Sequence, residues 1–374
     1  MLLLSDVLAI FVYGIIAAML GTILPEFSKR FQLSPKQNGN IAMAQAIGLM
    51  AGSFLAGPLM DVQGKKVGLL IGLGLIAIIL FLLRGAGGYG SVAGLMFLLG
   101  LGGGAVVTGG FALAGDVRIG SLTSAGVFNI VNVFFGLGGL LTPLLAAKLF
   151  QNNSGRLLIF SGSLAVVGLI VCATTEMAPP SGKVSFQPSL VGDLLAQKAL
   201  LLLALMLFLY VACEVGVWNW LVRHLIAQGV PEAKALSMLS LGFALGLLLG
   251  RLAASFVLSN VTPQHVLTGA AVLMAIFTFA MLQTGSAAAA QALVFLAGVA
   301  MAPVYPTTLA IVGAKFSAQA ATATGIAATA GWFGLVCSSP LIGGIAGDDP
   351  KRLRRALLVL PAFSIVMVVV SLAL

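Results

Sequence analysis

The stretch "FLYVACEVGVWNWLVRHL", residues 208–225, places one carboxylic acid, Glu214, in an apolar run. In a helix, Trp218 and Tyr210 lie one turn to either side of Glu214, so the three share a face. Asn219 adds an amide next to Trp218. Carboxylates and amides bind pairs of hydroxyl groups, and aromatic rings cover C–H faces. An acid inside an apolar span indicates a cavity, a partner or a proton, because the unpaired charge is costly there.

Other polar or aromatic residues in apolar segments could complete a solute site, and each also has a structural interpretation. The candidates are Gln45, Asn129, Asn132, Tyr305 and Trp332. The amides could instead form hydrogen bonds between helices, and the Tyr305-Pro306-Thr307 segment could only bend its helix. Trp332 could stack on a sugar ring or close a pathway. Arg251 could pair with Glu214 or belong to a charged latch at a helix end.

The elements that carry these residues must be membrane helices. The 374-residue chain is 60% hydrophobic and 8% charged, and apolar stretches recur from end to end. Lipid offers no hydrogen bonds to the backbone, so such stretches satisfy their own amides as helices. The alternation typical of a transmembrane barrel is missing. The sequence therefore predicts an all-α integral membrane protein.

We expect twelve transmembrane helices. Their predicted ranges are 5–27, 37–60, 66–84, 90–115, 122–150, 156–175, 198–226, 232–259, 263–284, 288–314, 318–346 and 351–374. A polar, proline-containing connection divides them into an N-terminal half at 1–175, a loop at 176–197 and a C-terminal half at 198–374. Phe11-Val12-Tyr13 returns as Phe208-Leu209-Tyr210, and Pro143 returns as Pro340, at one common offset. Repeated halves are typical of transporters.

Several other classes of function are not supported. The 19 basic residues are scattered between apolar segments, so the net charge of +9 indicates membrane-flanking residues and no nucleic-acid partner. His224 and His265 lack partners at metal-ligand spacing, and all three cysteines lie in apolar segments. The glycine-rich stretch at 100–110 lacks the lysine and hydroxyl of a phosphate loop and suits close helix packing. We expect no enzyme activity, cofactor or metal.

The segment "GPLMDVQGKK", Gly57 to Lys66, matches the spacing G-x-L-x-D-x-x-G-[RK]-[RK]. Here the chain resembles the major facilitator superfamily, in which this signature forms a charged latch that breaks when the halves rock. The resemblance implies latch roles for Gly57, Asp61, Gly64 and Lys65, with Arg251 as a candidate in the second half. We expect Asp61 to meet a helix N-terminus or a basic group. Val62 stands where a basic residue is usual.

Within that superfamily, four segments resemble the fucose permease family, also called the fucose-galactose-glucose proton symporters. They are "YVACEVGVWNWLVRHL", "LGRLAASFVLSNVTPQHVL", "MAPVYPTTLAIVG" and "NIVNVFFGLGGL". The resemblance implies transport of a monosaccharide. One departure affects mechanism: the family's first-helix aspartate before Ile-Leu-x-Pro is absent from "LGTILPEF", and its fourth-helix glutamate is absent from "GLGGGAVVTGG".

We therefore expect an alternating-access carrier for a monosaccharide or similar polyhydroxylated solute, secondary active or facilitative, with H⁺ or Na⁺ as candidate coupling ions. The expected solute contacts are Gln45, Asn129, Asn132, Glu214, Trp218, Asn219, Tyr305 and Trp332. Glu214 is the candidate proton carrier, because the other acids are expected in loops or towards helix ends. The alternatives are a drug or metabolite exporter of the same fold and a non-transporting sensor.

The resemblance also implies a multi-pass protein of a bacterial inner membrane, a monomer in contact with lipid, with both termini in the cytoplasm. The distribution of charge contradicts that orientation. Seven of the 19 Lys and Arg residues fall on the side that the resemblance makes cytoplasmic, and twelve fall on the other. The positive-inside rule alone would invert the protein. We follow the motif, because its spacing is more specific.

Overall fold

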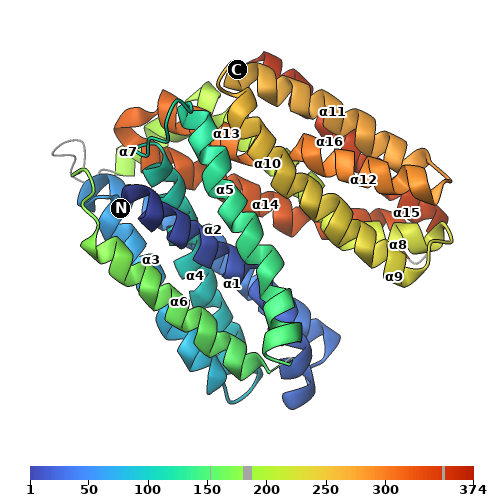
Figure 1. Cartoon of the computed structure of the whole chain (residues 1–374), viewed down its shortest axis with the longest axis horizontal. Coiled ribbons are helices and arrows are strands. Elements are labelled where there is room, and N and C mark those ends of the chain that lie inside the picture. Colours follow the sequence, from blue (N-terminus) through green and yellow to red (C-terminus); the bar gives the residue numbers. More distant parts are fainter. Residues whose placement is uncertain (152, 180–187, 348–349) are drawn as a thin grey trace. The chain divides into compact units, whose positions relative to one another are not determined.

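The computed structural model describes residues 1–151, 153–179, 188–347 and 350–374, which form helices joined by short connections (Figure 1). The first eight α-helices are α1 (Leu2–Arg30), α2 (Pro35–Gln63), α3 (Lys65–Arg84), α4 (Tyr89–Ala114), α5 (Ser124–Leu144), α6 (Ser154–Thr174), α7 (Pro188–Leu195) and α8 (Lys198–Ala227). The other eight are α9 (Glu232–Ser237), α10 (Leu245–Val257), α11 (Pro263–Gln283), α12 (Ala287–Met301), α13 (Val304–Lys315), α14 (Ala320–Ala346), α15 (Pro350–Ala356) and α16 (Val359–Leu372).

Within these described ranges, 12 helical segments are long and apolar enough to cross a membrane. The predicted all-α architecture and the number of spans are confirmed. Some spans combine several elements: α5 continues into a π-helical segment at Leu145–Leu149, and α9 and α10 are joined by another at Met238–Ala244. These two wide turns could not be predicted, because a π-helix has no strong sequence signature.

Proline and capping residues fix where several helices begin. Ser34 accepts a hydrogen bond from the Gln37 amide at 3.2 Å, and the Gln37 side chain accepts one from the Ser34 amide at 2.9 Å. This reciprocal capping box precedes Pro35, which needs no amide partner in the first turn. At α11, just before Pro263, the Thr262 hydroxyl accepts a hydrogen bond from the His265 amide. α11 starts at the predicted residue 263, and α2 starts at Pro35, two residues before the predicted 37.

Prolines also interrupt the tenth span. α12 ends at Met301 and α13 begins at Val304, with a turn at Ala302 and Pro303 between them. Neither Pro303 nor Pro306 can donate a backbone hydrogen bond, so two bonds of the helical ladder are lost. The predicted bend is present, but it lies just before Tyr305.

In the connection predicted at 176–197, the structure adds the short helix α7, and residues 180–187 lie outside the described residues.

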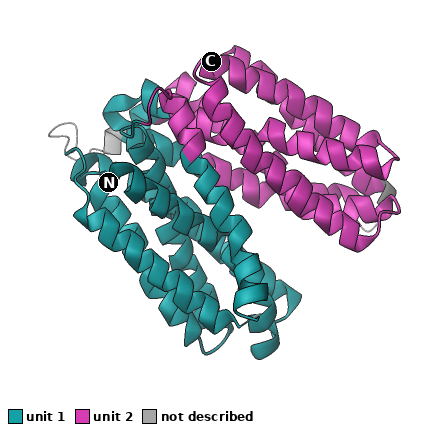
Figure 2. Ribbon diagram, viewed as in Figure 1, with its two compact units in different colours: residues 1–118, 131–194, 312–329 teal, residues 119–130, 195–311, 330–374 magenta. Residues whose placement is uncertain are grey.

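The chain forms two compact units, coloured separately in Figure 2. Unit 1 comprises residues 1–118, 131–194 and 312–329. Unit 2 comprises residues 119–130, 195–311 and 330–374. Two long helices are therefore shared: α5 begins in unit 2 and continues in unit 1, whereas α14 begins in unit 1 and continues in unit 2. The division at 176–197 stays a prediction.

In unit 1, α4 is central and packs against α1, α2 and α3, and α6 packs against α1 and α3. The contact between α2 and α4 is unusually close. A Cβ atom added at Gly48, Gly52, Gly100 or Gly104 would collide with a backbone carbonyl oxygen of the other helix. The predicted role of the glycine-rich stretch in helix packing is thus confirmed, because α4 runs through it without interruption.

Unit 2 has a similar close contact between α10 and α12. Gly246 of α10 and Gly298 of α12 each lie where an added Cβ would collide with the backbone of the partner helix. α12 also packs against α11, which packs against α16, and α16 packs against α8. The next glycine of α10, Gly250, stands directly before Arg251, so this close packing fixes the part of α10 that carries the guanidinium.

Candidate functional site

An acid and a base lie within the spans of unit 2. Glu214 in α8 and Arg251 in α10 approach to 4.0 Å between carboxylate Oε1 and guanidinium Nη2, with side chains 17% and 4% exposed. This distance is the outer limit of an ion pair, so the contact is loose. Of the two interpretations of Arg251, the geometry associates it with Glu214, because Arg251 is buried in the helix and not placed in a loop.

Two tyrosines flank this pair. Tyr210 lies one turn before Glu214 on α8, and Tyr305 lies on the first turn of α13, directly after the break at Ala302 and Pro303. Both rings are buried, and their centroids are 6.2 Å apart in a tilted arrangement. Both phenol groups lie close enough to Glu214 and Arg251 to interact electrostatically with these two charges. The four side chains form a polar cluster from three helices, which we name the α8–α10–α13 cluster.

A buried amide joins α5 to the same helix α13. The Asn129 side chain is fully buried and donates to the Ala125 carbonyl at 2.9 Å and to the Thr307 hydroxyl at 3.1 Å. Its donors therefore serve helix packing, which was the structural interpretation. Among the described residues, its carbonyl oxygen Oδ1 has no hydrogen-bond donor, so this atom can still accept one.

The remaining candidates of unit 2 are more dispersed. Trp218 is 39% exposed and packs edge-on against Phe243 at 5.4 Å between ring centroids. Asn219 lies about 140° around the helix from Glu214 and donates to the Ser339 hydroxyl at 2.7 Å. Trp332 lies in α14 and is buried. Asn219 therefore faces α14 and does not point towards the α8–α10–α13 cluster.

Unit 1 holds the other two predicted contact residues, Gln45 and Asn132. Both are buried. The Gln45 amide donates to the Ile16 carbonyl at 3.3 Å, which links α2 to α1. Asn132 follows Asn129 on α5 but belongs to unit 1, because the boundary between the units falls after Ile130.

Four of the five predicted latch residues lie in unit 1, whereas Arg251 lies in unit 2. Asp61, near the end of α2, caps α14. Its carboxylate accepts from the Ala321 amide at 3.1 Å, the Thr322 amide at 2.8 Å and the Thr322 hydroxyl at 2.5 Å. The expected contact with a helix N-terminus is thus present. Donors that lack intrahelical partners and a favourable dipole make a helix start a good site for a carboxylate.

Two glycines and a lysine complete the latch geometry. A Cβ at Gly57 would lie 2.6 Å from the Ala321 carbonyl oxygen and 2.7 Å from the Thr322 Cα, so only glycine lets α14 approach. Gly64 has φ = +96° and turns the chain from α2 to α3. Lys65 pairs with Asp116 at 2.6 Å, both side chains being partly exposed.

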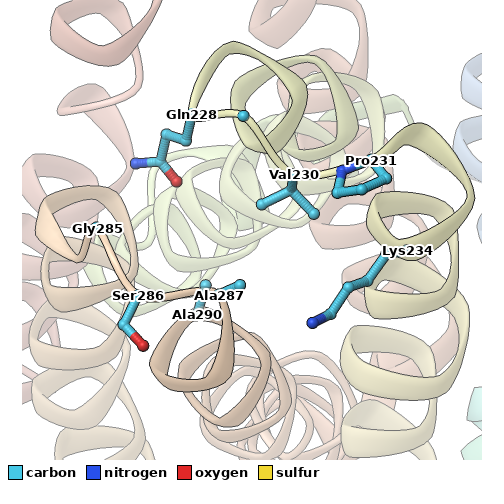
Figure 3. A pocket seen from close by; sticks show the side chains of 9 residues that line it. Gln228, Val230, Pro231, Lys234, Gly285, Ser286, Ala287 and Ala290 are labelled. Atoms are coloured by element: carbon cyan, nitrogen blue, oxygen red, sulfur yellow. The ribbon is translucent and has the colours of Figure 1, made fainter.

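A small cavity of about 220 Å³ lies at one end of unit 2, between the α8–α9 connection and the start of α12. Figure 3 shows Gln228, Pro231, Lys234 and Ser286 around it. Gln228 already donates to the Thr284 carbonyl at 3.2 Å, and Lys234 is exposed. None of the predicted contact residues lines this cavity.

The sequence profile of the Major Facilitator Superfamily matches residues 7–339. The chain belongs to this superfamily. It is therefore a multi-pass membrane transporter. None of the curated protein sequences compared with the chain matches it.

Solved structures of Major Facilitator Superfamily transporters share the fold over almost the whole chain. The E. coli fucose:proton symporter FucP, in the outward conformation, has a TM-score of 0.85 and 17% identity, over 99% of this chain and 98% of FucP. The proton:xylose symporter XylE has a TM-score of 0.77 and 14% identity, over 98% and 94%. The human organic anion transporter MFSD10 has a TM-score of 0.80 and 15% identity, over 99% and 98%.

One residue of this Major Facilitator Superfamily chain was missed by the sequence analysis. Glu214 was expected to be the single deeply placed acid, yet Asp6 in α1 is fully buried, more so than Glu214. The available signal was the acid in the apolar run "MLLLSDVLAIF". It was assigned to a helix end, where side chains are usually solvated. Packing of α4 against this end of α1 buries it instead.

Proposed function

We propose that this transporter moves a monosaccharide or a similar polyhydroxylated solute by alternating access. The observation that supports this most is the α8–α10–α13 cluster: an acid, a base and two phenols gathered within membrane spans. Charged groups inside spans are costly unless they bind something. The names of two neighbours, FucP and XylE, are those of sugar:proton symporters, which supports the same class of solute.

The chemistry of the cluster suits neighbouring hydroxyl groups. The Glu214 carboxylate can accept hydrogen bonds from two hydroxyl groups, and the planar Arg251 guanidinium can donate to hydroxyl oxygens. Trp218, which is well exposed, offers an aromatic face to the C–H side of a sugar ring. Tyr305 adds a hydroxyl and Asn129 an open acceptor atom.

The remaining predicted contacts complete the proposed set. They are Gln45 and Asn132 in unit 1, and Asn219 and Trp332 in unit 2. Gln45 and Asn219 each donate one hydrogen bond within the protein, so the carbonyl oxygen and the second N–H of each amide are offered to solute. We expect their contributions to be smaller than those of Glu214 and Arg251.

The direct test is uptake of labelled hexoses and pentoses into proteoliposomes that contain the purified transporter. We expect at least one sugar to be transported, and Glu214→Gln to reduce its binding. Arg223→Gln is the matched control, because Arg223 lies on the same helix but is exposed and stacks on Trp220. If no sugar of the panel moves or competes, the sugar assignment is wrong while the transporter fold stands.

We propose Glu214 as the coupling residue for a proton. Glu214→Gln keeps the size and part of the hydrogen bonding of the side chain but cannot ionise. A proton-coupled carrier should then lose accumulation driven by a pH gradient and, at a solute concentration that offsets the weaker binding, keep solute exchange, because exchange requires no net proton release. Wild-type transport that ignores an imposed pH gradient would identify facilitated diffusion or another ion, such as Na⁺.

A second candidate function is export of drugs or metabolites. The similarity to the organic anion transporter MFSD10 is close to that for the sugar symporters, and a buried guanidinium such as Arg251 suits an anionic solute. Efflux of amphipathic anions from inverted vesicles, lost in Arg251→Gln and not competed by sugars, would favour this candidate.

The latch and the orientation belong to the same proposal. We propose that the contacts of Asp61 and Gly57 with α14 and of Lys65 with Asp116 break and re-form during transport, with Gly64 holding the turn that places Lys65. We also propose a monomer in a bacterial inner membrane with both termini in the cytoplasm. Membrane-impermeant thiol labelling of a cysteine introduced at Asn153, on the opposite side in this topology, tests the orientation. If this cysteine is protected from labelling in intact cells, the orientation of the protein is the reverse of the one proposed.

A further inference from the structure

Asp6 in α1 is the most deeply buried acid of the described chain, with no exposed surface. Among the described residues, no donor reaches either of its carboxyl oxygens, and no cation lies within ion-pair distance. The preceding Ser5 is equally buried. Helix capping does not explain Asp6, because it lies inside α1 and not at its first turn. A fully buried carboxyl group without these partners lowers stability, so its presence indicates a function.

The groups around Asp6 come from several packed elements. On α4, the absence of a side chain at Gly110 makes room: Oδ1 of Asp6 lies 3.3 Å from where a Cβ would be. The charges that act on Asp6 are Lys65 of α3 and Asp116 after α4. From α6, the Cys172 thiol interacts with Ser5, and Lys66 donates to the Thr175 carbonyl at 3.0 Å.

Lys65 is the cation common to these acids, since its charge also acts on Asp6. It bonds to Asp116 at 2.6 Å, and its charge also acts on Asp61, which caps α14. Three carboxyl groups, Asp6, Asp61 and Asp116, therefore face one ammonium. While Lys65 is held by Asp116, Asp6 has no cation. A buried carboxylate without a partner is far less stable than the neutral acid, so Asp6 then holds a proton.

We propose that Asp6 is a proton-binding residue of this transporter, separate from Glu214 and linked to the latch. The inference rests on the proposed transport cycle. When the Lys65 contact with Asp116 breaks, the ammonium can pair with Asp6. Asp6 then releases its proton to the water on the latch side and becomes a carboxylate. Asp116, which is 37% exposed, stays ionised and is solvated. Charge balances, because one proton leaves and one ion pair replaces another.

The first test detects the proton directly. Infrared spectra of the purified full-length protein in lipid nanodiscs report protonated carboxyl groups through their C=O stretch. At neutral pH we expect a band in the wild type that Asp6→Asn lacks and that Ser5→Ala, its packing control, retains. In Asp116→Asn, where Lys65 is free to turn to Asp6, the band should vanish at a lower pH. An Asp6→Asn spectrum that lacks no band would show that Asp6 is ionised, and would overturn the proposal.

The second test measures the link to the latch. The Ala321 and Thr322 amides donate to Asp61, so their hydrogen exchange, corrected for the intrinsic rate at each pH, reports latch opening. Raising the pH removes the proton from Asp6, and the resulting carboxylate draws Lys65 away from Asp116. Opening of the latch should therefore rise several-fold in the wild type. Asp6→Asn, which is permanently neutral, should show no such rise. If Asp6 only fills space, the pH profiles of the two proteins will coincide.

Neither readout requires a solute. A failed sugar assay therefore leaves these measurements interpretable, and a flat pH profile leaves the sugar proposal untouched. Asp6→Asn preserves the shape of the side chain. If it nevertheless fails to fold, the Asp116→Asn infrared shift in the otherwise native protein still decides the proposal, because an unshifted band would contradict it.

Discussion

The two units place their charges in different ways. In unit 1, Asp61, Lys65 and Asp116 lie at helix ends, are themselves partly or well exposed, and make short contacts of 2.5–3.1 Å. In unit 2, Glu214 and Arg251 lie within spans and approach only to 4.0 Å. Contacts at helix ends can break into water at little cost, whereas a charged pair buried within spans carries a high desolvation cost. The first arrangement suits a switch, and the second suits a binding site.

Removing one member of the buried pair should have the largest effect. Arg251→Gln leaves the Glu214 carboxylate without its cation, and we expect the free energy of unfolding in detergent micelles to fall by about 3 kcal/mol. This lies at the low end for broken buried pairs, because Glu214 is partly exposed. The double variant Glu214→Gln with Arg251→Gln should lose less than the sum of the single changes. Additive losses would mean that the pair is not coupled.

A methyl group at the latch should have the next largest effect. Gly57→Ala places a Cβ 2.6 Å from the Ala321 carbonyl oxygen, so α14 must move away. We expect a loss of about 2 kcal/mol, typical of overpacking, with faster hydrogen exchange at the start of α14. Gly39→Ala is the matched control on the same helix, since nothing lies within 4 Å of its added Cβ. If the two substitutions had equal effects, the close approach of α14 would not depend on the missing side chain at Gly57.

Neutralising the cap should have a smaller effect. Asp61→Asn keeps an acceptor oxygen for the Thr322 amide but loses the charge that favours a helix N-terminus. Exchange at the Ala321 and Thr322 amides should rise about fivefold, equivalent to about 1 kcal/mol. Glu232→Gln, an exposed acid in the first turn of α9, is the control and should leave α14 unchanged. Unchanged exchange in Asp61→Asn would mean that geometry, not charge, holds the latch.

The hydrogen bond between Asn129 and Thr307 should have the smallest effect. A double-mutant cycle with Asn129→Ala and Thr307→Val should give a coupling of about 0.6 kcal/mol, the average for hydrogen bonds between membrane helices. Unfolding in detergent measures the stability of the four proteins. A coupling near zero would return Asn129 to the group of residues whose main role is solute contact.

The spans and the latch could be predicted because their causes are local. Apolar length sets a span, and Ser34 followed by Pro35 starts a helix wherever the rest of the chain lies. The Asn129 contact with Thr307 joins residues 178 positions apart, and nothing near either residue announces it. Likewise, Asp6 is buried by α4, which begins far along the chain. The shared helices α5 and α14 arise from such distant contacts too, so the composition of the units could not be anticipated.

The glycine contact between α2 and α4 has a genetic consequence. Gly48, Gly52, Gly100 and Gly104 each face a backbone oxygen of the other helix, so the contact has no side chain that could shift to absorb a change. Every amino acid that replaces glycine brings a Cβ atom. At these codons there is consequently no mild missense mutation, and inherited variation should be restricted to synonymous changes.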